Sequence, residues 1–271
     1  MIKQAIIPLA GLGTRLLPLT SVFAKELLPI NGKTGLSYIL DECIEAGIKE
    51  IIFIISKKKL MIKKYFYNDK FYKDIIKKKK DPHIISEYKK ILKYKKMIKF
   101  VFQDKPLGTG DAVLKTKKFI KDKYFLMLLP DDLIVKKNCS KSMISVHKKY
   151  KVPVMASMKV TKKEVTRWGI FNIKKKIDNK NFIIQNVIEK PSIKNAPSNN
   201  AVIGRYILPI TIFNKISKLK PGKNKEIHIT DAIQSLIDDN NIFIGHNFYG
   251  KYLDCGTMKG YINSTMEILK K

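Results

Sequence analysis

The chain has 271 residues, of which 45% are hydrophobic, and its formal net charge is +31. This length and apolar content support a buried core in one large α/β domain or two small ones. No run reaches the roughly 18 apolar residues that a membrane helix needs, and the N-terminus lacks a signal-peptide cleavage pattern. The three widely separated cysteines match neither a disulfide framework nor a metal knuckle. We therefore expect a cytoplasmic protein without a membrane partner.

The positive charge comes almost entirely from lysine. Of the 54 basic residues only Arg15, Arg167 and Arg205 are arginine. Proteins that read nucleic-acid sequence rely on arginine forks, and the lysine runs here lack the interleaved aromatic side chains that stack on bases. We interpret the lysines as surface positions altered by a drift toward A/T-rich codons, and we expect no nucleic-acid partner.

Apolar runs and helical patterns alternate along the chain. In the first half we expect strands over 3–10, 50–56, 98–103 and 124–131, and helices over 37–46, 84–97 and 110–120. The lysine-rich segment 57–96 is interpreted as a helical excursion. In the second half we expect strands over 152–160, 169–173, 182–189, 200–208 and 242–247, and helices over 210–219, 231–238 and from 257 onward.

This alternation implies right-handed crossovers and a mostly parallel sheet. We predict a Rossmann-like α/β fold with helices flanking the central sheet and a strand-rich second half. No linker rich in Pro, Gly or Ser divides the chain, so we expect one domain over 1–271, with halves that meet near residue 135. In such sheets ligands bind at the carboxyl ends of the strands.

The first expected strand runs into a glycine loop that contains Ala10, Gly11, Gly13, Thr14 and Arg15. Glycine lets backbone N–H groups close around phosphate oxygens. The cations Arg15 and Lys25 can neutralise the charge of those phosphates. The loop therefore indicates a nucleoside triphosphate site, although the glycines alone would also suit a plain strand-to-helix turn.

Two common phosphate motifs do not fit this loop. The dinucleotide-binding fingerprint needs a third glycine where the chain has Leu16. A Walker A loop ending in Gly32-Lys33-Thr34 needs an earlier glycine where the chain has Leu27. The spacing therefore argues against both.

Gln103 ends an expected strand and precedes a second glycine loop at Gly108. Its amide carries a donor and an acceptor side by side, and uracil and thymine present N3–H beside carbonyl oxygens. Gly108 would let the backbone approach such a base. A polar loop without a ligand is the alternative interpretation.

Asp131 and Asp132 end the very apolar strand 124–130. Magnesium takes few protein ligands because it keeps contact with substrate phosphates. One of these carboxylates and a second from Asp254 would suffice. Which of Asp131 and Asp132 touches the metal is open at this point, and Asp254 alone would also suit a helix N-terminus.

Glu189 and Lys190 end another apolar strand. Strand alternation would point them to opposite sides, one toward sugar hydroxyls and the other toward a phosphate. Gly169 would bring backbone close to a ligand, and Glu226 is a weaker candidate for a sugar contact.

Taken together, these motifs resemble the sugar-phosphate nucleotidyltransferases over almost the whole chain. The similarity is greatest to the bacterial UTP–glucose-1-phosphate uridylyltransferases, also called UDP-glucose pyrophosphorylases. The matching motifs occur in order along the chain: 10–15, 25–29, 189–191, 204–206, 226–233 and 254–256.

The resemblance implies a nucleotide-binding half over about 1–135 and a sugar-binding half over about 136–271. It implies transfer of a uridylyl group from UTP to glucose 1-phosphate, with Mg²⁺ as cofactor on Asp131 and Asp254. By resemblance, Arg15, Lys25 and Lys190 are catalytic; Ala10, Gly11, Gly13, Thr14, Arg15, Gln103 and Gly108 bind the nucleotide; and Gly169, Glu189, Lys190 and Glu226 bind the sugar. Relatives are commonly oligomers, so we expect a homo-oligomer.

The chain departs from the family pattern at Ala24 and Thr34, where proline is usual, and at Asp111, where histidine is usual. We expect these changes to affect loop rigidity and sugar preference rather than the reaction type. Three alternatives stay open: a thymidylyltransferase, an N-acetylglucosamine-1-phosphate uridylyltransferase, and a catalytically silent regulatory paralogue. The second of these carries a C-terminal β-helix of hexapeptide repeats, and this sequence has no such repeat.

Overall fold

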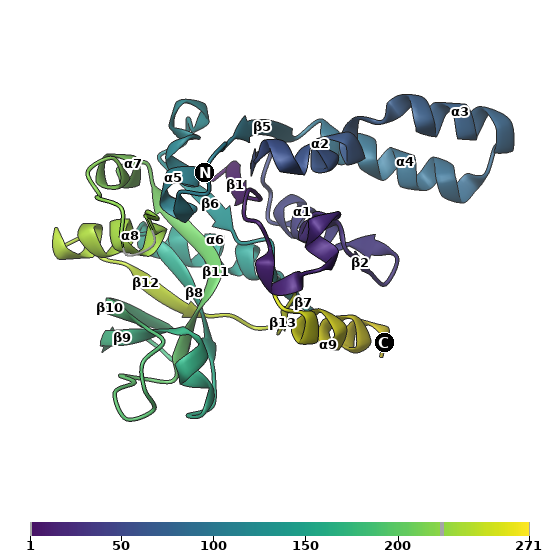
Figure 1. The fold of residues 1–271 in the computed structure, drawn as a ribbon. Coiled ribbons are helices and arrows are strands. Elements are labelled where there is room, and N and C mark those ends of the chain that lie inside the picture. Colours follow the sequence, from purple (N-terminus) through teal and green to yellow (C-terminus); the bar gives the residue numbers. More distant parts are fainter. Residues whose placement is uncertain (1, 223–224, 271) are drawn as a thin grey trace.

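A computed structural model of the protein describes residues 2–222 and 225–270. Its main feature is a nine-stranded sheet (Figure 1) in the order β5-β4-β1-β6-β11-β8-β12-β10-β9. The strands are β1 (Gln4–Pro8), β4 (Glu50–Ile55), β5 (Ile98–Phe102), β6 (Tyr124–Leu128), β8 (Val154–Lys159), β9 (Gly169–Lys176), β10 (Asn181–Glu189), β11 (Asn200–Pro209) and β12 (Ile244–Asn247).

The sheet changes character between the two halves of the chain. Strand β1 pairs in parallel with β4 and β6, and β4 pairs in parallel with β5. Strand β11 then runs antiparallel to β6 and β8, while β12 is parallel to β8 and antiparallel to β10. The α/β class is confirmed, with a parallel Rossmann-like block followed by a strand-rich second half. The expectation of a mostly parallel sheet is wrong, because four of the eight neighbouring strand pairs are antiparallel.

Two hydrophobic cores cover the two faces of the sheet. Because side chains alternate along a strand, Ala5 and Ile7 of β1 pack into one core and Ile6 packs into the other. The first core includes buried residues of α1 (Gly35–Glu45), α6 (Cys139–Tyr150) and α9 (Met258–Leu269). The second includes residues of α5 (Gly108–Leu114), α7 (Ile212–Ile216) and α8 (Ile229–Asp238).

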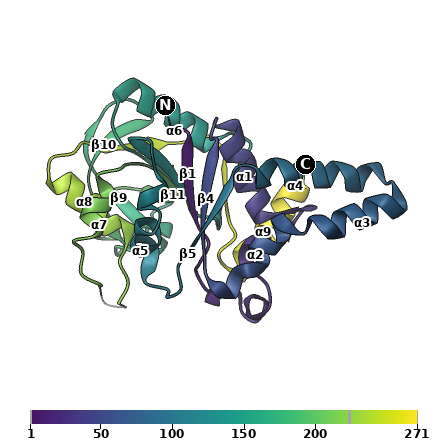
Figure 2. The same ribbon diagram turned by 90° about the horizontal axis from the view of Figure 1, so that it is seen from above.

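The lysine-rich segment forms a helical arm that projects from the body of the molecule (Figures 1 and 2). It consists of α2 (Leu60–Tyr67), α3 (Asp69–Lys79) and α4 (Pro82–Lys95). Phe66 anchors the arm in the first core, and Tyr72 stacks on Tyr88 with ring centroids 4.9 Å apart. The predicted helical excursion is thereby confirmed.

Two expected helices are several residues shorter in the structure. The helix expected over 110–120 begins at Gly108 and ends at Leu114, and a separate 3₁₀ turn, Lys117–Phe119, follows it. The helix expected over 210–219 is shortened to α7. Apolar periodicity continues through such turns, so it does not locate their boundaries.

The structure contains two small sheets that the sequence analysis did not predict. One is the hairpin of β2 (Pro29–Ile30) and β3 (Lys33–Thr34). The other pairs β7 (Asp132–Val135) with β13 (Lys251–Asp254) and places Asp132 opposite Asp254. This second pairing joins the two halves of the chain beside the proposed metal ligands.

The main sheet runs without a break from the first half of the chain into the second. The organisation as a single domain with halves that meet near residue 135 stays a prediction. Within the described residues, every helix is too short or too polar to cross a membrane.

Candidate active site

A cavity of about 500 Å³ opens where β1, β5 and β6 end. Since these parallel strands end at one edge of the sheet, the segments that follow them meet there. The lining includes nine residues that the sequence singles out: Ala10, Gly11, Gly13, Thr14, Lys25, Gln103, Gly108, Asp131 and Glu226. The predicted nucleotide-binding residues are therefore brought together around one cavity, with Arg15 beside it through a contact to Asp131.

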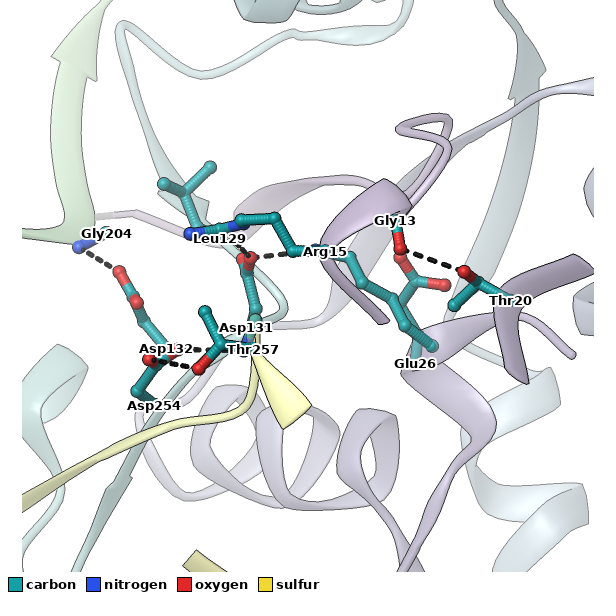
Figure 3. A network of polar contacts seen from close by, with 12 residues as sticks. Gly13, Arg15, Thr20, Glu26, Leu129, Asp131, Asp132, Gly204, Asp254 and Thr257 are labelled. Carbon is teal, nitrogen blue, oxygen red and sulfur yellow. Dashed lines mark hydrogen bonds and ion pairs between the residues drawn. The ribbon is translucent and has the colours of Figure 1, made fainter. Parts of the chain in front are cut away.

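Backbone conformation shapes the glycine loop. Gly13 has a φ of 69°, in the left-handed region that favours glycine, and a Cβ there would lie 3.1 Å from Thr20 Cγ2. Thr20 Oγ1 donates a 2.9 Å hydrogen bond to Gly13 O (Figure 3). The loop then enters a 3₁₀ turn, Thr14–Leu16. The glycines therefore form an anchored turn with its backbone at the cavity wall.

Three charged groups meet at one wall of the cavity. Lys25 Nζ lies 2.7 Å from Asp131 Oδ2, and Arg15 Nη2 lies 3.5 Å from the same oxygen. Burial lowers the pKa of Lys25, but Asp131 and Glu26 outweigh it and raise that pKa above its usual value. Burial raises the pKa of Asp131, but Lys25 and Arg15 hold it below its usual range. Both groups are therefore ionised at neutral pH.

A buried ion pair lies directly behind Lys25. Lys59 Nζ is 2.8 Å from both carboxylate oxygens of Glu26, and both side chains are buried. This pair ties the base of the helical arm to the turn Lys25–Leu27. The sequence contains no signal for it, because Lys59 ends a run of three lysines that looks like exposed surface.

Asp131 and Asp132 point to different partners. Asp132 Oδ2 accepts a 2.8 Å hydrogen bond from the Gly204 N–H, and its Oδ1 accepts one of 2.7 Å from the Tyr252 hydroxyl. Burial, reinforced by the charge of Asp131, raises the pKa of Asp132 to about 6. Asp131 is thus the carboxylate that lines the cavity. Asp132 instead binds the backbone N–H of Gly204 (Figure 3).

Asp254 approaches Asp131 from the other half of the chain. Its Oδ1 accepts from the Gly256 N–H at 2.8 Å, and its Oδ2 accepts from Thr257 Oγ1 at 3.1 Å. A Cβ at Gly256 would lie 2.7 Å from Asp131 Oδ2 and 3.3 Å from Asp254 Oδ1. These two oxygens are therefore no more than about 6 Å apart, the sum of the two distances.

This pair of carboxylates fits a magnesium ion. Mg²⁺ is bound in proteins by one or two carboxylates together with substrate phosphates and water. The described residues contain no group of three or more His, Cys, Asp and Glu side chains that could hold a metal. The donor set is therefore suited to a metal that arrives with a phosphate ligand rather than to a closed protein site.

The arrangement of Glu189 and Lys190 corrects one expectation. Alternation does not point them to opposite sides, because the strand ends at Glu189 and Lys190 has a left-handed φ of 44°. Lys190 Nζ consequently lies 3.8 Å from Glu189 Oε1, with both side chains exposed. A Cβ at Gly169 would lie 3.1 Å from Glu189 Oε2, so three of the four predicted sugar residues are neighbours.

A second cavity, of about 630 Å³, contains only one of the predicted site residues, Asp254. Arg167 and Trp168 also line it. The predicted sugar residues Gly169, Glu189 and Lys190 line neither large cavity. Glu226 instead lines the 500 Å³ cavity with the nucleotide residues.

The buried Arg205 holds the segment that carries Asp131. Its guanidinium makes three contacts of 2.8–3.1 Å to the Glu42 carboxylate. It also donates to Leu129 O at 3.1 Å and to Asp132 O at 2.6 Å, on either side of Asp131. The sequence shows this arginine only as part of a motif, and its buried partner Glu42 lies 163 residues away.

The fold and this cavity define a nucleotidyltransferase. Residues 4–271 match the family described as Nucleotidyl transferase, and the chain belongs to that family. Two relatives are UTP–glucose-1-phosphate uridylyltransferases. The Bacillus subtilis protein is 34% identical over 98% of this chain and 90% of its own length. UTP–glucose-1-phosphate uridylyltransferase 1 of Staphylococcus saprophyticus is 33% identical over 100% of this chain and 93% of its own length.

Solved structures agree with these relatives. A UDP-glucose pyrophosphorylase complexed with UDP-glucose is 33% identical, with a TM-score of 0.86 over 100% of this chain and 99% of that one. A UTP-bound UGPase from Acinetobacter baumannii is 31% identical, with a TM-score of 0.90 over 99% of this chain and 93% of that one. The resemblance inferred from the motifs is confirmed.

Proposed function

We propose that this chain transfers a uridylyl group from UTP to glucose 1-phosphate. A phosphate oxygen of glucose 1-phosphate forms a bond to the α-phosphorus of UTP, the bond from that phosphorus to the β-phosphate bridging oxygen breaks, and pyrophosphate leaves. The products are UDP-glucose and pyrophosphate. The observation that carries this proposal is the meeting of Asp131, Lys25 and Arg15 beside the 500 Å³ cavity, with Asp254 no more than about 6 Å from Asp131.

The chemical difficulty of this reaction is charge repulsion between two anionic substrates. Two unit charges 4 Å apart repel by about 4 kcal/mol at an effective dielectric constant near 20. Lys25 and Arg15 can hold the β- and γ-phosphates and stabilise the leaving group. When bound by Asp131 and Asp254, Mg²⁺ would supply further positive charge to the reacting phosphates. Catalysis would then rest on positioning and charge compensation.

The other predicted site residues would bind the two substrates. The loop Ala10, Gly11, Gly13 and Thr14 would lie against the triphosphate. Gln103 and Gly108 would bind the base. Gly169, Glu189 and Lys190 would hold the sugar phosphate, with Glu226 as a further sugar contact. We also infer a homo-oligomer in the cytoplasm that binds UTP and glucose 1-phosphate and no nucleic acid.

The function is tested by incubating the purified protein with UTP, Mg²⁺ and a panel of hexose 1-phosphates while pyrophosphate is measured. We expect the highest kcat/KM with glucose 1-phosphate. Pyrophosphate formation with dTTP at a higher kcat/KM than with UTP would support a thymidylyltransferase instead. Absence of pyrophosphate with every pair would support a silent paralogue and overturn the proposal.

A further inference from the structure

The amide of Gln103 is held in one orientation by Asp111. Gln103 is buried, and its Nε2 donates to Asp111 Oδ2 at 2.8 Å and to Gly108 O at 3.2 Å. Lys115 Nζ lies 3.4 Å from Asp111 Oδ1. An ionised carboxylate can only accept hydrogen bonds, so Asp111 requires the nitrogen of the amide to face it. The amide oxygen must then face away.

The first turn of α5, which carries Asp111, is held by contacts with the second half of the chain. Gly110 N donates to Ile227 O at 2.7 Å, and Ile227 N donates to Leu107 O at 2.8 Å. Gly108 has a φ of 94°, and a Cβ there would lie 2.5 Å from Ile227 O. Asp111 itself is buried in α5. The carboxylate is therefore fixed beside Gln103 by backbone contacts from the second half of the chain.

This geometry leaves one hydrogen-bonding group of Gln103 for a ligand. Both of its N–H groups have partners in Asp111 and Gly108, whereas no described residue donates to its Oε1. Gln103 also lines the 500 Å³ cavity. The sequence alone indicated an adjacent donor and acceptor, but in the structure only the acceptor is without a partner among the described residues.

We propose that Asp111 is a positioning residue that sets the base specificity of the enzyme. By turning the Gln103 oxygen toward the cavity, it selects a base that carries a proton on N3, such as uracil or thymine. Cytosine presents a bare N3 lone pair, and two acceptors facing each other are unfavourable. This inference rests on the proposed function, because it assumes that Gln103 contacts the base.

The test compares UTP with CTP in the wild-type protein and in the Asp111→Asn variant. The asparagine amide can accept from Gln103 Nε2 or donate to Gln103 Oε1. Only the 3.2 Å contact with Gly108 O then still favours the wild-type orientation. We expect the ratio of kcat/KM for UTP to that for CTP to fall at least about tenfold. Calorimetric binding of UMP and CMP should show the same change in ratio. Asp104→Asn, which removes an exposed carboxylate next to Gln103 in sequence, should keep the wild-type ratio.

The outcomes separate this inference from the proposed function. A folded Asp111→Asn variant with the wild-type UTP-to-CTP ratio in both measurements would overturn the role of Asp111. If the wild-type protein binds UMP in preference to CMP but releases no pyrophosphate, the proposed function is overturned and the role of Asp111 in base selection is not. The double variant Q103E/D111N keeps one amide and one carboxylate with their places exchanged, so an acceptor must again face the cavity. It should recover the preference for UMP, and equal binding of CMP would overturn the inference.

Discussion

Lys25 Nζ and Asp131 Oδ2 lie 2.7 Å apart, so the proposed phosphate-binding cation is paired with the proposed metal-binding anion. Each charge compensates the other in a partly buried setting, where an unpaired charge is costly. A complex of UTP with Mg²⁺ brings one partner for each of them: phosphate for Lys25 and metal for Asp131. The two groups can therefore exchange partners on substrate binding without leaving a charge uncompensated.

The two carboxylates are expected to act in the chemical step. Asp131→Asn or Asp254→Asn should lower kcat at least about a hundredfold, which corresponds to roughly 2.7 kcal/mol of barrier. The reason is that either change removes one anionic ligand from the proposed metal. Steady-state rates of pyrophosphate formation provide the measurement. Asp74→Asn on the projecting arm changes the same charge far from the cavity and should retain full activity.

Gly256 lies between the groups that would share the metal. In Gly256→Ala the new methyl group would come within 2.7 Å of both Asp131 Oδ2 and Arg15 Nη2. We expect a loss of activity of at least about tenfold with little change in melting temperature. The side chains of Asp131 and Arg15 can move to make room for the methyl group, so the fold is kept, but they then lose the alignment that catalysis needs. Gly35→Ala at the start of α1 meets only ordinary contacts of 3.7 Å or more and is the control. Equal activity of the two variants would contradict the assigned geometry.

The Arg205–Glu42 pair should dominate the stability of the Asp131 segment. Glu42→Gln leaves the fully buried guanidinium without its counter-charge, and such changes cost about 3–5 kcal/mol. Urea unfolding of the variant should show this loss. Glu45→Gln, on the same helix but exposed and 4.0 Å from Lys141, should change the free energy of unfolding by less than about 0.5 kcal/mol. Similar values for both variants would show that the buried pair is not a major contribution.

His246 predicts a pH dependence of stability. Burial lowers its pKa to about 4, while Ser142 Oγ and Asn181 Oδ1 lie 2.7 and 2.8 Å from its ring nitrogens. An unfolded histidine takes up its proton near pH 6.5, so the unfolded state binds more protons between pH 6.5 and 4. Stability contributed by His246 is therefore lost as pH falls through that window.

The measurement compares wild type with His246→Gln by urea unfolding at pH 7.5 and pH 4.5. Wild type should lose more free energy of unfolding between these two values than the variant does. Other groups titrate equally in both proteins, so the difference isolates His246. An identical loss in the two proteins would exclude the assignment.

The strand pattern and the glycine loop could be predicted because they depend on local sequence. Apolar runs of five or six residues such as Glu50–Ile55 form buried parallel strands, and Gly13 adopts a conformation that other residues avoid. The segments after β1, β5 and β6 then meet because parallel strands end at one edge. These local rules were enough to bring Lys25, Gln103 and Asp131 to one cavity.

Contacts between residues that are far apart in the sequence could not be predicted from local patterns. Pairing of β7 with β13 joins residues about 120 positions apart, and Glu42 meets Arg205 across 163 positions. The run of lysines around Lys59 is typical of exposed surface, and only the structure shows its buried ion pair with Glu26. The prediction that Glu189 and Lys190 point to opposite sides of a strand was wrong, because the left-handed backbone at Lys190 ends the strand.

Asp131 and Asp254 are proposed to hold one divalent metal beside the reacting phosphates. A crystal of the protein with UDP-glucose and Mn²⁺, in which anomalous scattering locates the metal, tests this arrangement. We predict a single peak in the cavity within about 2–2.5 Å of an oxygen from each carboxylate. Bound UDP-glucose with the metal held elsewhere, or with either carboxylate turned away from it, would show that Asp131 and Asp254 do not share a metal.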